Sequence, residues 1–235
     1  MPASVPEARS ETPRVGLVEA VVLTLAVIAA MLLVGAGGEI WLRSIDPLWL
    51  ARFGAQGTVL YGIATMAYAS ALAVLVAWGL RRRWSLAGTL ALRPVGAADA
   101  VLAVAVGLAS FLVTARLLGN RPGLLVSMPA SELAMLALAL RFVAVGLLAP
   151  LVEEVLFRRV LFIPLAGASH WLVAALVTTL VWTLLHPLTS IFALSLIAIQ
   201  GLMLAAVARG TGSISYGLIA HVAHNVAAAL WAVLV

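Results

Sequence analysis

The stretch of sequence that decides the fold is residues 132–163, ELAMLALALRFVAVGLLAPLVEEVLFRRVLFI. It exceeds one simple membrane crossing, because a helix rises about 1.5 Å per residue and the hydrocarbon layer is about 30 Å thick. It contains Pro150, which we expect to kink or break the helix. Four of its charges fall within residues 151–159, LVEEVLFRR. Charges at that depth cost about 2.5–3.5 kcal/mol each on insertion scales, so they persist when paired, when facing a wet cavity or when functional.

Composition places the rest of the chain in a membrane as well. The 235 residues are 64% hydrophobic and 10% charged, whereas a soluble domain is about half apolar and about a quarter charged. The absence of cysteine excludes disulfides, thiolate nucleophiles and cysteine-based metal sites. All 14 basic residues are arginine. They lie at the ends of apolar segments and form no basic stripe with interleaved aromatic residues, so we expect no nucleic-acid partner.

Apolar segments of membrane-spanning length recur along the chain, without an internal repeat or a soluble domain. They are residues 15–37, 57–80, 97–118, 132–163, 171–186, 188–208 and 214–235. The predicted fold class is therefore all-α, a polytopic transmembrane helical bundle of about seven or eight membrane segments. Within this single membrane domain we expect a polar tail at 1–14, N-terminal transmembrane helices at 15–129 and a C-terminal transmembrane core at 130–235.

The arginines also predict the orientation of the bundle. Short cytoplasmic loops carry an excess of basic residues, and one side of the expected bundle carries Arg81, Arg82, Arg83, Arg93, Arg158, Arg159 and Arg209. We expect this side, and the N-terminus with it, to be cytoplasmic. An Ala/Leu/Arg-rich chain without lysine is typical of a GC-rich bacterial genome, so the predicted location is the cell membrane, with the lipid bilayer as partner.

The charges in LVEEVLFRR separate into two groups. Glu154 and Arg158 are four residues apart, with the acid first, which is the favoured order for an ion pair on a helix. We interpret them as a structural pair. Glu153 is turned by about 100° around the helix from Glu154, so it cannot pair with Arg158 equally well. It is left as a carboxylate below the headgroups without a local counter-charge.

Polar residues that could join Glu153 occur in two later apolar segments. They are His186 in WTLLHP, and His221, His224 and Asn225 in HVAHN. His221 and Asn225 share a helical face. A glutamate poised by a histidine can take a proton from water, and a His–Asn pair can donate hydrogen bonds to an oxyanion. Alternatively, Glu153, His186 and His221 could hold a divalent metal such as zinc, which would activate the water itself.

The residues that mark three other kinds of hydrolytic site in membrane proteins are not arranged for one in this sequence. It contains neither an HExxH nor a GxSxG motif, and Asp46 and Asp99 both lie at loops or segment ends. A mechanism with two buried aspartates is therefore not expected.

Four motifs in fixed order resemble a known family. They are Glu153-Glu154-xxx-Arg158, Trp182-xxx-His186, Gly210-Thr-Gly-Ser213 and His221-xxx-Asn225. This order, over residues 130–230, resembles the CPBP family, the CAAX-protease and bacteriocin-processing (Abi) intramembrane proteases, which are related to type II CAAX prenyl endopeptidases. One departure is Trp182, where the family usually has phenylalanine.

The resemblance implies an endopeptidase that cleaves a membrane-associated protein or peptide. It implies that Glu153 activates water with help from His186, and that His221 and Asn225 stabilise the oxyanion. Glu154 and Arg158 match the structural pair, and His224 matches no motif position. The family is commonly described as metalloproteases, yet a metal-free glutamate mechanism is also argued for it, so both alternatives stay open.

Two other hypotheses for the function remain. The first is a non-catalytic membrane scaffold or bacteriocin-immunity protein with the same fold, against which the complete set of four polar residues argues. The second is a small proton-coupled transporter that uses Glu153 and the histidines as a relay. Inverted repeats would favour a transporter, and the sequence shows none.

Overall fold

The computed structural model describes residues 15–45, 58–118, 132–186 and 190–234, and these residues contain helices and no strand. The all-α class is therefore confirmed, while the predicted tail at 1–14 lies outside the described residues. The elements are α1 (Leu17–Ile45), α3 (Thr58–Arg81), α4 (Leu86–Thr89), α5 (Ala97–Leu117), α6 (Glu132–Arg141), the π-helix η3 (Phe142–Leu148), α7 (Ala149–Glu153), the π-helix η4 (Glu154–Phe162), α8 (Ile163–Ala168), α9 (Trp171–Leu184), α10 (Ile191–Thr211) and α11 (Ser215–Leu234).

The bundle has the dimensions and surface of a multi-pass membrane protein. Among the described residues, five helical segments are long and apolar enough to cross a bilayer: α1, α3, α5, α10 and the run Met135–Ala168. α9 has 14 residues and so spans only about 21 Å. Large apolar side chains such as Val18, Leu33 and Ile191 are 79%, 75% and 86% exposed. Such an outer surface suits lipid and would be costly in water.

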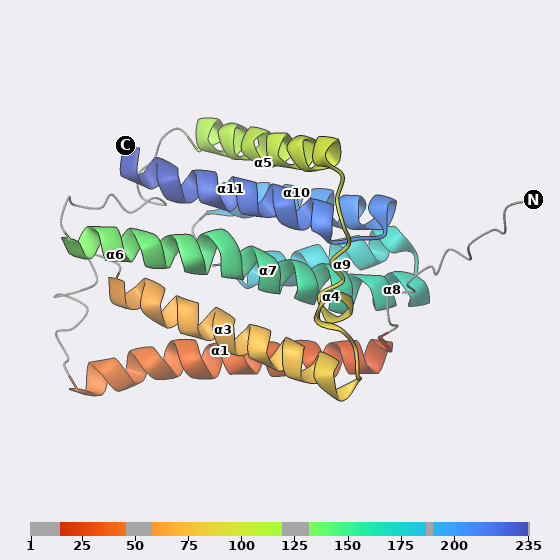
Figure 1. The fold of residues 1–235 in the computed structure, drawn as a ribbon, viewed down its shortest axis with the longest axis horizontal. Coiled ribbons are helices and arrows are strands. Elements are labelled where there is room, and N and C mark those ends of the chain that lie inside the picture. Colours follow the sequence, from red (N-terminus) through yellow and green to blue (C-terminus); the bar gives the residue numbers. More distant parts are fainter. Residues whose placement is uncertain (1–14, 46–57, 119–131, 187–189, 235) are drawn as a thin grey trace, which may run out of the picture.

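The segment that begins at Glu132 forms one long helical run to Ala168 and is central in the bundle (Figure 1). α1 and α3 lie on one side of it and α5 and α11 lie on the other, while α9 lies behind the run and α10 lies behind α11 in this view. Pro150 does not end this run. The backbone instead changes from the π-helix η3 to the short α-helix α7 at Ala149 and returns to a π-helix at Glu154. Glu153 is therefore the last residue of an α-helical turn between two π-helices, a feature often found at functional sites.

Small residues allow the neighbouring helices to approach closely. A Cβ atom on Gly107 of α5 would collide with the backbone carbonyl of Ala220 on α11. A Cβ on Gly201 of α10 would lie 2.8 Å from the ring of Trp182 on α9. Gly107 thus lets α5 pack directly on α11, and Gly201 lets α10 pack directly on the ring of Trp182 in α9.

Candidate active site

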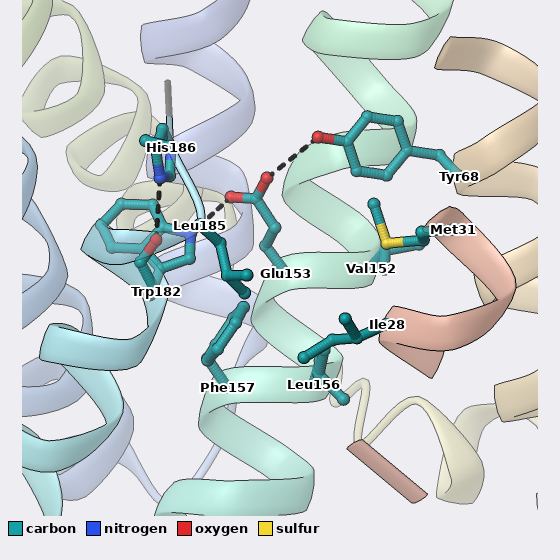
Figure 2. Close-up of a pocket in the computed structure, with 10 residues that line it drawn as sticks. All are labelled: Ile28, Met31, Tyr68, Val152, Glu153, Leu156, Phe157, Trp182, Leu185 and His186. Carbon is teal, nitrogen blue, oxygen red and sulfur yellow. Dashed lines mark hydrogen bonds between the residues drawn. The ribbon is translucent and has the colours of Figure 1, made fainter. Parts of the chain in front are cut away.

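Glu153 is held between two hydrogen-bond donors from different helices (Figure 2). The indole Nε1 of Trp182 on α9 donates to Oε2 over 2.7 Å, and the hydroxyl of Tyr68 on α3 donates to Oε1 over 3.3 Å. The Glu153 side chain is 15% exposed. Each carboxylate oxygen therefore has one protein donor, and further lone pairs stay available for a water or a substrate.

The carboxylate lies in the wall of a cavity of about 130 Å³. This volume would hold a few water molecules at about 30 Å³ each, or one medium-sized side chain. The cavity connects α1, α3, the central run and the end of α9. Its lining is Ile28, Met31, Tyr68, Val152, Glu153, Leu156, Phe157, Trp182, Leu185 and His186 (Figure 2). The polar groups of Glu153 and His186 thus share one mostly apolar chamber.

His186 follows the end of α9 and is oriented by the backbone. Its Nδ1 atom lies 2.9 Å from the carbonyl oxygen of Trp182, and its ring stands edge-on to the indole with the centroids 4.9 Å apart. A carbonyl oxygen can only accept, so Nδ1 carries the proton of the neutral ring and Nε2 is an acceptor. His186 can therefore take a proton from a water in the shared cavity.

His221 on α11 lies between the two neighbouring glutamates. Its Nδ1 is 3.3 Å from Oε1 of Glu154, and its Nε2 is 3.9 Å from Oε2 of Glu153. His221 is 3% exposed and Glu154 is 1% exposed. Glu154 thus orients the imidazole so that Nε2 lies toward Glu153, as a carboxylate orients the histidine in many hydrolytic sites.

Arg158 is buried beside Oε2 of Glu154, whereas His221 lies near Oε1. Its Nε lies 3.7 Å from Oε2 of Glu154, an ion-pair distance without a hydrogen bond. Its Nη2 donates to the carbonyl of Gly201 over 3.2 Å, and its guanidinium lies 5.2 Å from the centre of the Trp182 ring. Arg158 therefore balances the charge of Glu154 while it also supports the indole that holds Glu153.

The side chains of Asn225 and His224 have hydrogen-bond partners other than Glu153. The Asn225 amide donates over 2.8 Å to the backbone carbonyl of Val145 in η3. The Nδ1 of His224 lies 3.1 Å from the hydroxyl of Ser110 on α5, and its ring stands edge-on to Phe111. His224 thus joins α11 to α5, which gives it a packing role outside the cavity.

Of the predicted site residues, the structure brings Glu153 and His221 together and places His186 on the same cavity wall. The sequence pattern did not indicate the two donors, Tyr68 and Trp182. A tyrosine or tryptophan inside an apolar segment carries a donor that needs a partner when buried, and this is the only signal that could have indicated them.

The side chains do not fit a metal centre. Within the described part of the chain, no three His, Asp or Glu side chains gather closely enough to hold a metal ion. The glutamate oxygens accept from protein donors instead, and Nδ1 of His186 faces a carbonyl.

Residues 135–227 match the family model described as type II CAAX prenyl endopeptidase Rce1-like. The matched range includes all four motifs that carry the CPBP resemblance and so confirms it, whereas Tyr68 lies outside the range. No curated protein and no solved structure matches the chain.

Proposed function

Since residues 135–227 form an Rce1-like domain of the CAAX-protease family, we propose that the chain is an intramembrane endopeptidase. Its substrate is a membrane-associated protein or peptide, and a water activated by Glu153 and His186 hydrolyses the peptide bond. One observation carries this proposal: Glu153 is a partly buried carboxylate, fixed by two donors, in the wall of a cavity that His186 also lines. A site of this kind holds a base and a water in a fixed geometry.

The proposed reaction balances without any further reactant. Glu153, assisted by Nε2 of His186, takes a proton from the water while the water oxygen attacks the scissile carbonyl carbon. The tetrahedral intermediate then collapses, the C–N bond breaks, and the proton passes to the departing amine. The products are a free carboxylate and a free amine.

His221 is the group best placed to stabilise the intermediate. Glu154 accepts a hydrogen bond from Nδ1, so that Nε2 is directed to the side where Glu153 lies. In its doubly protonated form His221 can donate from Nε2 to a developing oxyanion. Glu154 would therefore have two roles: it orients His221 for catalysis, and it balances the charge of Arg158.

The direct test compares protein N-termini in cells that produce the wild-type chain with those in cells that produce Glu153→Gln at the same level. We expect a small set of new N-termini, mapping near membrane segments, with the wild type alone. Identical sets in both cell lines would contradict the proposal and would favour a non-catalytic scaffold.

We predict that Trp182→Phe lowers kcat about tenfold with little change in KM. The indole bond to Glu153 is short and charge-assisted, and such bonds contribute roughly 1.5–3 kcal/mol. Phenylalanine keeps an aromatic ring beside Arg158 and His186 but removes the donor. Tyr68→Phe should cost less, because its bond is 3.3 Å long. Steady-state kinetics on a peptide from the first identified substrate would measure both, and a wild-type kcat for Trp182→Phe would show that the indole donor is dispensable.

We further propose that the arginine-rich end of the bundle is cytoplasmic. The sequence has no cysteine, so single cysteines can be introduced without background. Ala166→Cys in α8 and Thr211→Cys at the end of α10 lie at the same end as the arginines that follow α3 (Figure 1). A membrane-impermeant thiol reagent should label both only in opened cells. Ile45→Cys is the matched control. Ile45 is the last residue of α1, at the end of the bundle opposite the arginines, and it is 63% exposed, so the reagent should label it in intact cells. The reverse pattern would invert the topology.

A further inference from the structure

The backbone before Glu153 contains a carbonyl that the helix cannot pair. At the end of η3, the Ala149 N–H bonds to the carbonyl of Ala144, five residues earlier. The next bond in that register would run from residue 150 to the carbonyl of Val145. Residue 150 is proline, which has no N–H. In an apolar bundle an unpaired backbone carbonyl is costly, so it requires a donor from elsewhere.

Asn225 supplies that donor. Its Nδ2 lies 2.8 Å from the Val145 oxygen, where the missing backbone N–H would have contributed its hydrogen bond. A helix interrupted by proline is commonly repaired in this way, through a polar side chain of a neighbouring helix. α11 packs directly on both η3 and α7, so the contact joins two elements that flank the site.

We propose that Asn225 is a positioning residue that replaces the missing amide of Pro150 and thereby sets the distance between Glu153 and His221. Pro150 is three residues before Glu153, and Asn225 is one helical turn after His221 on the same face of α11. The hydrogen bond to Val145 therefore fixes the helix that carries the carboxylate against the helix that carries the imidazole. This role differs from the oxyanion contact that the family resemblance implies for Asn225.

The effect on catalysis rests on the proposed function, but the repair of the backbone does not, and a double-mutant design separates the two. Asn225→Ala leaves the Val145 carbonyl without a donor. Pro150→Ala restores an N–H at the position from which the π-helical register would reach that carbonyl. If Asn225 acts through this carbonyl, Pro150→Ala must rescue Asn225→Ala; an asparagine that donated only to an oxyanion could not be rescued in this way.

We expect Asn225→Ala to lower both the thermal unfolding temperature and the folded yield in detergent. With a peptide from the first identified substrate, kcat should fall roughly tenfold while KM stays near the wild-type value. The double variant should regain most of the folded yield, the unfolding temperature and kcat. Pro150→Ala alone completes the cycle, and Pro164→Ala in the Asn225→Ala background is the matched control. It removes a proline from the same helical run, in α8, that cannot reach Val145.

The outcomes are decisive even when one variant does not fold. If Asn225→Ala alone is lost and the double variant is recovered, the repair is supported. If the double variant is as unstable as Asn225→Ala, or if Pro164→Ala rescues equally well, the inference is overturned. Rescue of stability without rescue of kcat would keep the repair and overturn the positioning role. A wild-type chain that is stable but cleaves nothing would contradict the proposed function instead.

Discussion

Purified Glu153→Gln is expected to fold and to retain less than about 1% of the wild-type cleavage rate. A positioned general base contributes roughly 10²–10⁴-fold to such reactions, and the amide of glutamine cannot act as one. The local contacts should survive the change, because the amide oxygen can accept from Trp182 while the amide N–H₂ donates to Tyr68. The tyrosine hydroxyl can reverse its role and accept, whereas the indole can only donate. Single-turnover cleavage of an identified substrate measures the loss.

Glu19→Gln is the matched control for this experiment. Glu19 on α1 also accepts from an indole, that of Trp78, over 2.8 Å, and it also accepts from Arg82. It thus shares the chemistry of Glu153 but lies at the arginine-rich end of the bundle, away from the cavity. We expect Glu19→Gln to cleave at close to the wild-type rate. Equal rates for wild type and Glu153→Gln would remove Glu153 from the catalytic step.

The sequence was sufficient for the class of fold because lipid restricts the chain to helices that satisfy their own backbone. Each expected apolar segment corresponds to a helix or, for 132–163, to the continuous helical run from Glu132 to Ala168. Most predicted ends lie within three residues of the observed ones, but α1 continues to Ile45 instead of ending near residue 37, and the central run continues to Ala168 instead of residue 163. The two π-helices could not be foreseen, because the apolar pattern of the segment does not distinguish hydrogen bonds to the fourth residue from those to the fifth. The expectation that Pro150 would interrupt the segment therefore missed how the helix continues through it.

The candidate site was predictable to the extent that charge in an apolar segment demands an explanation. Glu153 was identified because its neighbour Glu154 had an arginine at the right spacing and it had none. Tyr68 was out of reach, since 85 residues separate it from Glu153 and no local pattern joins the two. Trp182 stands where the resembled family usually has phenylalanine, and the motif alone does not indicate that its N–H gives the carboxylate a short hydrogen bond. The contacts of a polar atom depend on the tertiary fold, which periodicity does not describe.

The largest effect on stability is expected at the pair of Glu154 and Arg158. Both side chains are essentially buried, at 1% and 0% exposed. Removing one partner leaves the other charge buried and uncompensated, which costs about 3–5 kcal/mol. Glu154→Leu should therefore lower the folded yield and the unfolding temperature markedly. Glu154→Leu combined with Arg158→Leu should recover part of the loss, because two apolar side chains leave no stranded charge.

Recovery should be incomplete, for two reasons that the contacts supply. Arg158 also donates to the Gly201 carbonyl, and the double variant loses this hydrogen bond, while Glu154 also holds Nδ1 of His221. The exposed pair Glu39–Arg43 has the same spacing and a shorter separation of 2.7 Å, but its side chains are 40% and 48% exposed. A double-mutant cycle on Glu39 and Arg43 should give a coupling free energy of less than about 1 kcal/mol, since solvent screens such pairs. If the two cycles gave equal coupling, or if the double variant at 154 and 158 recovered nothing, burial would not be what couples Glu154 to Arg158.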